Sequence, residues 1–231
     1  MRRRNCSSPQ ILVHTLLRGL HIFRNSYTLS CMKYEPKPLP FAAAPNGISE
    51  KTLTTHHDKL YVGYVTKKNE IEEKLTPLQQ GGDIAGANQT YSELRALKDG
   101  ETFAVNGVYL HEWYFDVLGG DGQPSGALAD ALAAQHGGSI ENFLKYFAAC
   151  GMAARGWAVL ALDTRDTQLK VFTCDAHHQG GVWGAIPLIV LDVYEHAYFM
   201  DYGSDRAAYI SAFLKQLNWS RANELYAAAI K

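Results

Sequence analysis

The sequence predicts an α+β fold in which a helical N-terminal domain, built as a long helical hairpin, precedes a C-terminal domain with a three-stranded antiparallel sheet flanked by helices. Apolar residues at helical spacing dominate the first domain, which we expect over 32–120. In the second, expected over 121–231, two β-type runs at 156–163 and 169–174 are joined by a polar turn. A third apolar run at 186–192 completes the sheet.

The composition is that of a globular protein, since 47% of the 231 residues are hydrophobic and 11% are aromatic. No apolar run approaches the length that spans a bilayer. After residue 31 the chain holds 17 of the 22 basic residues and all 23 acidic ones, a net charge of −6. This charge argues against nucleic-acid binding, and an anionic substrate would need a local cation or a metal to attract it. Four cysteines without paired spacing indicate free thiols rather than disulfides or a zinc ribbon.

Residues 1–31 differ from the rest because they contain five arginines and no acidic residue. Their apolar part, 11–23, is interrupted by two histidines and an arginine, so it makes a poor secretory signal. The segment is either an Arg-rich targeting sequence or upstream sequence outside the fold, with an ordinary start at Met32. The first interpretation implies import into an organelle, and the second implies a cytoplasmic protein.

The first helix is predicted over about 50–74, because Ser49 can cap its N-terminus and apolar residues recur at three- and four-residue steps. One face of this helix carries Leu53, His56, Leu60 and Tyr64. His56 and His57 point about 100° apart on a helix, and we expect His56 to be the one that faces this stripe. The helix alone leaves open whether His56 is a ligand or belongs to a histidine pair at the solvent edge.

Two further helices are expected at 88–97 and 106–118, after a glycine-rich break at 81–86. The last of them has an apolar stripe made of Ala104, Val108, His111, Phe115 and Leu118. A histidine in the middle of such a stripe either hydrogen-bonds a neighbour in the core or binds a metal. The glycine-rich stretch 119–126 then marks the expected boundary between the two domains.

The second domain begins with helices expected at 125–135 and 140–153, with His136 in a capping position between them. The sheet follows. Two helices, expected at 204–217 and 219–230, then end the chain.

The apolar run 186–192 is rich in branched residues and apolar on both faces, which predicts a fully buried strand. It ends in Asp192, and a buried carboxylate is costly unless a cation or several donors satisfy it. His196 follows four residues later and can return to the same point if the chain turns at once. The two residues are therefore either half of a metal site or a turn-capping acid beside a core histidine.

Five motifs are spread along the chain: His56-His57 with Tyr64-Val65, Asn106-Gly-Val-Tyr-Leu-His111, Gly156-Trp157, Asp192-Val-Tyr-Glu195-His196-Ala-Tyr198, and Tyr202 with Arg206, Tyr209 and Asn218-Trp219. Together they resemble the iron/manganese superoxide dismutase family over about residues 34–230. The string that begins at Asp192 is highly specific to that family.

The resemblance implies one iron or manganese ion per chain, bound by His56, His111, Asp192 and His196. It also implies an antioxidant enzyme whose substrate is superoxide and whose metal cycles between the 2+ and 3+ states, with dioxygen and hydrogen peroxide as products. The alternative is an inactive metal-binding structural relative of the same fold. The family likeness further implies a homodimer or a homotetramer.

The resemblance implies roles for four residues around the metal. Tyr64 resembles the tyrosine at the gateway of the substrate channel, and Trp157 resembles the wall that keeps the metal pocket dry. Glu195 resembles a residue that crosses a dimer interface to hold the other subunit's metal-bound histidine. His177 stands where a less common branch of the family has a histidine in place of the usual glutamine, and His178 is the alternative.

Three positions depart from the common pattern of the family. Tyr194 stands where a tryptophan is usual, and Val159 stands where a second tryptophan often follows Trp157. Leu60 occupies a helix position that often holds a histidine, partnered by the tyrosine that matches Tyr198. This last change puts the usual proton relay in doubt and allows a lower turnover, but it leaves the four ligands in place.

Overall fold

Residues 33–42 and 44–231 are described by the computed structural model of the chain. The two interpretations of residues 1–31 concern a segment outside this described part. No helix within the described part is long and apolar enough to cross a membrane. Its two cysteines, Cys150 and Cys174, are free thiols, as their spacing predicted.

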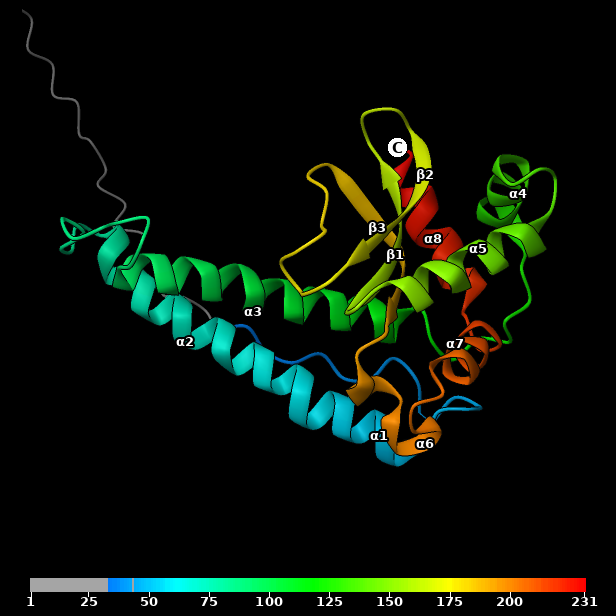
Figure 1. The fold of residues 1–231 in the computed structure, drawn as a ribbon, viewed down its shortest axis with the longest axis horizontal. Helices are drawn as coiled ribbons and strands as arrows, with labels where there is room; N and C mark the ends of the chain where they lie inside the picture. Colours follow the sequence, from blue (N-terminus) through cyan, green and yellow to red (C-terminus); the bar gives the residue numbers. More distant parts are fainter. Residues whose placement is uncertain (1–32, 43) are drawn as a thin grey trace, which may run out of the picture. The chain divides into compact units, whose positions relative to one another are not determined.

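A helical hairpin forms the first half of the described chain (Figure 1). Its first arm is continuous and consists of α1 (Glu50–Thr55), the π-helical turn η1 (His56–Tyr61) and α2 (Val62–Gln79). The Ser49 side chain accepts a hydrogen bond from an amide of the first turn, so the predicted N-cap is confirmed. The helix extends five residues beyond the predicted end at 74, and the π-turn was not predicted.

The second arm is the 24-residue helix α3 (Glu93–Asp116), and the prediction of separate helices at 88–97 and 106–118 is wrong. The Ser92 side chain caps the start of α3 by accepting a hydrogen bond from Arg95 N. Gly100 does not interrupt the helix, because α3 packs against α2 so closely that an added Cβ there would lie 3.3 Å from Ile71 Cδ1. Tertiary packing therefore outweighs the low helix propensity of this polar, glycine-containing stretch.

The sheet has the strand order β2-β1-β3, and both pairings are antiparallel. Its strands are β1 (Trp157–Asp163), β2 (Gln168–Cys174) and β3 (Ala185–Asp192), which confirms the predicted hairpin and the predicted third strand. The prediction that this third strand is fully buried holds only from Leu188 to Asp192, because Ile186 is 38% exposed. The register of β1 and β3 pairs Trp157 with Asp192. The end of β3 therefore lies beside the start of the central strand.

The predicted helices of the second half are confirmed with small changes of their ends as α4 (Gly126–Gln135), α5 (Ile140–Ala153), α7 (Arg206–Leu214) and α8 (Trp219–Ala229). His136 is the C-cap residue of α4, as expected. Two short elements that were not predicted follow β3: the 3₁₀ turn η2 (Glu195–Ala197) and α6 (Phe199–Tyr202). They make the immediate turn that returns the chain to the end of the strand.

One buried core joins the hairpin to the sheet, because α3 packs against β3 (Figure 1). Val108 and Tyr114 of α3 and Trp157 and Val190 of the sheet are all 0% exposed. The predicted apolar stripe of α3 is therefore the surface that meets the sheet. This junction lies where His111 and Asp192 approach each other, and it holds the functional site.

Candidate metal centre

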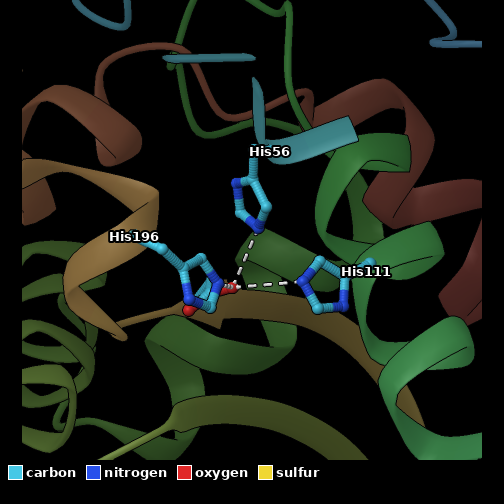
Figure 2. A group of neighbouring side chains, drawn as sticks. His56, His111 and His196 are labelled. Carbon is cyan, nitrogen blue, oxygen red and sulfur yellow. Dashed lines mark hydrogen bonds and ion pairs between the residues drawn. The ribbon is translucent and has the colours of Figure 1, made fainter. Parts of the chain in front are cut away.

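Four side chains from four elements converge on one point. His56 comes from η1, His111 from α3, Asp192 from the end of β3 and His196 from η2. Figure 2 shows the three imidazoles pointing inward at one carboxylate oxygen. The Nε2 atoms of His56, His111 and His196 lie 3.2, 3.7 and 3.1 Å from Asp192 Oδ2. One potential ligand atom from each residue lies within 4.8 Å of all the others.

These residues fit an iron or manganese ion. Within the described residues, Nε2 of His56 and Nε2 of His111 are buried and have no hydrogen-bond partner, although both approach Asp192 Oδ2. Buried polar atoms are normally paired, so unpaired nitrogens around one carboxylate oxygen indicate a cation among them. Three imidazoles and one carboxylate are a ligand set that suits iron or manganese.

The protonation states also favour a metal. Burial lowers the pKa of His56 and His111, so these two imidazoles are neutral. Burial opposes ionisation of Asp192, but His196 and His56 outweigh it and hold the pKa of this carboxyl well below its usual range. Burial also lowers the pKa of His196, yet the Asp192 carboxylate raises it by more. Because metal ligands must be deprotonated, the raised pKa of His196 means that metal binding here should weaken as the pH falls.

The metal-free protein should lose stability as the pH falls from about 7 to about 5. Burial lowers the folded pKa values of His56, His111 and His177 below the usual histidine value of 6.5, so at these three positions the unfolded chain binds more protons than the folded chain over this range. His196 acts in the opposite direction, because its raised pKa stabilises the fold below 6.5. Because the pKa of His177 falls to about 4 and those of His56 and His111 are lowered as well, we expect the unfolding temperature of metal-free protein to be lower at pH 5 than at pH 7. A higher unfolding temperature at pH 5 would contradict these protonation states.

Hydrogen bonds to the main chain orient two of the four candidate ligands. His111 Nδ1–H donates to Gly107 O at 2.5 Å, which leaves its Nε2 lone pair for a metal. Asp192 Oδ1 accepts from Tyr194 N at 2.9 Å, so Oδ2 is the oxygen that faces the histidines. The buried Tyr209 hydroxyl donates to the Asp192 carbonyl at 2.8 Å. No role was predicted for Gly107; its position four residues before His111 was the signal that could have identified it.

His177 lies beside this centre, and His178 does not. The Trp157 indole N–H donates to His177 Nδ1 at 3.0 Å, so the proton of the neutral imidazole is on Nε2. Burial lowers the pKa of His177 to about 4, which keeps the ring neutral. The neighbouring His178 instead approaches Asp99, with 3.5 Å between its Nε2 and Oδ1.

Tyr64 is half-buried, with its ring centroid 5.2 Å from that of His111 and 4.7 Å from that of His177. Burial, with a smaller contribution from Asp192, raises the pKa of Tyr64 to about 12, so its hydroxyl stays protonated. The ring packs so closely on α3 that a Cβ added at Gly107 would lie 2.7 Å from it. Trp157, which is fully buried, packs edge-on against His111 with 5.1 Å between ring centroids.

Three further residues of the family pattern differ in exposure, since Glu195 is exposed, Leu60 is half-buried and Tyr198 is buried. The Glu195 side chain makes no hydrogen bond or ion pair in the described part of the chain. The Tyr198 hydroxyl accepts a hydrogen bond from Arg206 Nε at 3.3 Å, so within this chain Tyr198 is paired with an arginine.

Comparison with known proteins agrees with this geometry. The alpha-hairpin domain of the iron/manganese superoxide dismutases matches residues 26–119, and their C-terminal domain matches residues 124–225. The chain belongs to the iron/manganese superoxide dismutase family. The resemblance stated from the motifs is therefore confirmed.

Relatives within this family carry names with either metal. The chain is 46% identical to a superoxide dismutase [Fe] of Aquifex pyrophilus over 203 residues, which cover 86% of this chain and 93% of the relative. It is 40% identical to superoxide dismutase [Mn] 1 of Halobacterium salinarum over 203 residues, 85% of this chain and 96% of the relative. A superoxide dismutase [Fe] of Cupriavidus metallidurans is 39% identical over 204 residues, 87% of this chain and 100% of the relative.

Proposed function

We propose that this chain is a superoxide dismutase whose single iron or manganese ion is held by His56, His111, Asp192 and His196. The observation that carries the proposal is the buried convergence of three imidazoles and one carboxylate in a member of this family. The relatives reported above are named superoxide dismutases, which favours an active enzyme over the alternative of an inactive metal-binding relative.

The ion, when bound, would supply reversible one-electron chemistry between its 2+ and 3+ states, by which one superoxide is oxidised to dioxygen and a second, with two protons, is reduced to hydrogen peroxide. The chain supplies the ligands and the route for protons. His177 holds a proton on Nε2 because its Nδ1 accepts from Trp157. Tyr64 keeps its hydroxyl proton and is half-buried between the centre and solvent. We infer that these two groups deliver protons to the reacting oxygen species.

Trp157 contributes in two ways to this proposal. It is fully buried against His111, so it excludes water from that side of the centre. Its indole N–H also selects the tautomer of His177, as described above. This pairing supports placing the chain in the branch that has a histidine where a glutamine is usual.

The working metal can be identified by reconstitution. Metal-free protein loaded separately with iron and with manganese should bind about one ion per chain, as the four-ligand site predicts. The catalysed decay of superoxide, followed by stopped-flow absorbance, then shows which form is fast. If the protein binds iron or manganese but neither loaded form accelerates the decay of superoxide, the result would support the inactive relative instead.

We further propose that two copies of the chain pair around Glu195, as the family likeness implies. Glu195 is exposed directly before the ligand His196, and the following Phe199 and Met200 are 55% and 45% exposed. Neighbouring exposed apolar side chains can mark a surface that contacts another protein, and Phe and Met are enriched in such surfaces. A tetramer would require a second contact surface.

The Glu195→Ala variant should dissociate at a protein concentration about tenfold or more higher than the parent, because the proposed contact is a charge-assisted one with the partner's metal-bound histidine. Sedimentation velocity over a dilution series measures this shift. As a control, Glu224→Ala removes another acidic side chain that is paired with Arg221 on α8, and it should leave the association unchanged. Equal association of the parent and Glu195→Ala would rule out the proposed contact.

The division of the folded chain near residue 120 is also proposed, and it is supported by family matches that end at 119 and resume at 124. The location of the protein is proposed to be the cytoplasm, because segment 11–23 makes a poor secretory signal. Import into an organelle is the alternative. Fluorescent fusions of the full chain and of a chain that begins at Met32 distinguish them, since only a targeting segment makes the two fusions differ.

A further inference from the structure

A second polar cluster lies on α3 immediately beside the metal centre. Glu112 follows the ligand His111, so the two side chains point about 100° apart around the helix. The Glu112 carboxylate receives three donors: the hydroxyls of Tyr34 and Tyr61, at 2.7 and 2.9 Å from Oε1, and the Lys37 ammonium on Oε2. Its side chain is only 14% exposed, which makes these charge-assisted hydrogen bonds stronger than surface ones.

One donor comes from the turn that carries His56, and the other two come from a segment that is hydrogen-bonded to this turn. Tyr61 is the last residue of η1, and His56 is the first residue of the same turn. Tyr34 and Lys37 belong to the extended segment 33–38. π-Helical turns are rare and occur often at functional sites, so the contacts that hold this turn bear directly on the ligand that it carries.

The main chain of the extended segment is fastened to the same turn. Lys37 N donates to the Tyr61 hydroxyl at 2.9 Å, and His57 Nε2 donates to Lys37 O at 2.8 Å. The Tyr34 backbone exchanges two hydrogen bonds with the Asn69 side chain on α2, at 2.8 and 2.9 Å. Burial raises the pKa of Tyr61 well above its usual value, so its hydroxyl remains a donor to Glu112.

We propose that Glu112 is a positioning residue for the metal, whose carboxylate ties the π-turn that carries His56 to the helix that carries His111. One ligand lies near each end of this linkage, because Tyr61 is five residues from His56 and Glu112 is adjacent to His111. Without the linkage, the two imidazoles would lose their fixed separation. This proposal rests on the proposed metal centre, but it goes beyond the four ligands and their hydrogen bonds.

The test uses two variants of the manganese-loaded full chain, Glu112→Gln and Tyr61→Phe. Both should release manganese to a chelator about tenfold faster than the parent, as is usual when residues that orient metal ligands are changed. Both should also shift the visible ligand-field band of trivalent manganese, because the geometry of the ligands changes. Tyr61→Phe removes one hydroxyl and keeps the buried ring, so it provides the test if Glu112→Gln does not fold.

Two control variants match these substitutions on the surface. Glu70→Gln removes an exposed acid that pairs with Lys67 on α2, and Tyr91→Phe changes a tyrosine that is 86% exposed. Both should behave as the parent does. An unchanged release rate and an unchanged band in both test variants would overturn the proposal, even if their unfolding temperatures fell, because the cluster would then serve only stability.

The outcome is separable from that of the proposed function. If the parent binds manganese but does not accelerate superoxide decay, the proposed function fails, while the release rates and spectra still decide the role of Glu112. If the parent binds neither iron nor manganese, both proposals are overturned.

Discussion

The Asp192→Asn variant should bind iron or manganese at least about 100-fold more weakly than the parent and lose nearly all superoxide decay activity. Oδ2 of Asp192 is the atom on which the Nε2 atoms of all three histidines converge. An amide of the same shape removes the only negative charge among the four ligands, and it can direct an N–H group at the histidines. Metal titration of metal-free protein, with stopped-flow assay of the loaded forms, measures both effects.

A matched control is available at the opposite end of the sheet. Asp163 ends β1 and pairs with Lys170, away from the four ligands. Asp163→Asn should therefore bind metal and turn over as the parent does. Full metal occupancy and normal activity in Asp192→Asn would show that Asp192 is not a ligand.

The His177→Leu variant should keep about one metal ion per chain but lose about 10- to 100-fold in turnover. The substitution removes the Nε2–H donor that Trp157 fixes through its hydrogen bond to Nδ1. Trp157→Phe should cause a smaller loss, because the histidine stays in place while its tautomer is no longer selected. Turnover measured at saturating superoxide, together with metal content, separates this effect from loss of metal.

The adjacent histidine provides the control. His178 has its Nε2 near Asp99 and packs against Phe103, so His178→Leu should leave turnover close to that of the parent. The opposite pattern, with His178→Leu slow and His177→Leu normal, would reverse the assignment of the two residues.

Much of the site could be predicted because its signals are local. A short window of sequence shows a strand that is apolar on both faces and ends in Asp192. The same window shows His196 four residues later. The stripes that place His56 and His111 on inward helix faces follow from helical periodicity, and both residues are fully buried. The family motifs then joined these separate signals into one ligand set.

What could not be predicted depends on contacts between distant segments or on packing. The π-turn at His56–Tyr61 keeps a helical pattern of residue types, so periodicity does not distinguish it from an α-helix. The continuity of α3 through Gly100 depends on its packing against α2. The Trp157–His177 hydrogen bond joins residues 20 apart, and the Tyr34–Glu112 bond joins residues 78 apart. No short stretch of sequence carries either signal.

The most direct test of the central claim is a loading series in which metal content and superoxide decay rate are measured on the same samples. Elemental analysis gives iron and manganese per chain, and stopped-flow absorbance gives the rate. The proposed centre predicts a rate that rises in proportion to occupancy by the working metal, reaches its maximum at about one ion per chain, and is absent from metal-free protein. A superoxide decay rate that does not follow metal occupancy would contradict the proposed centre. A chain that binds only zinc would contradict it as well.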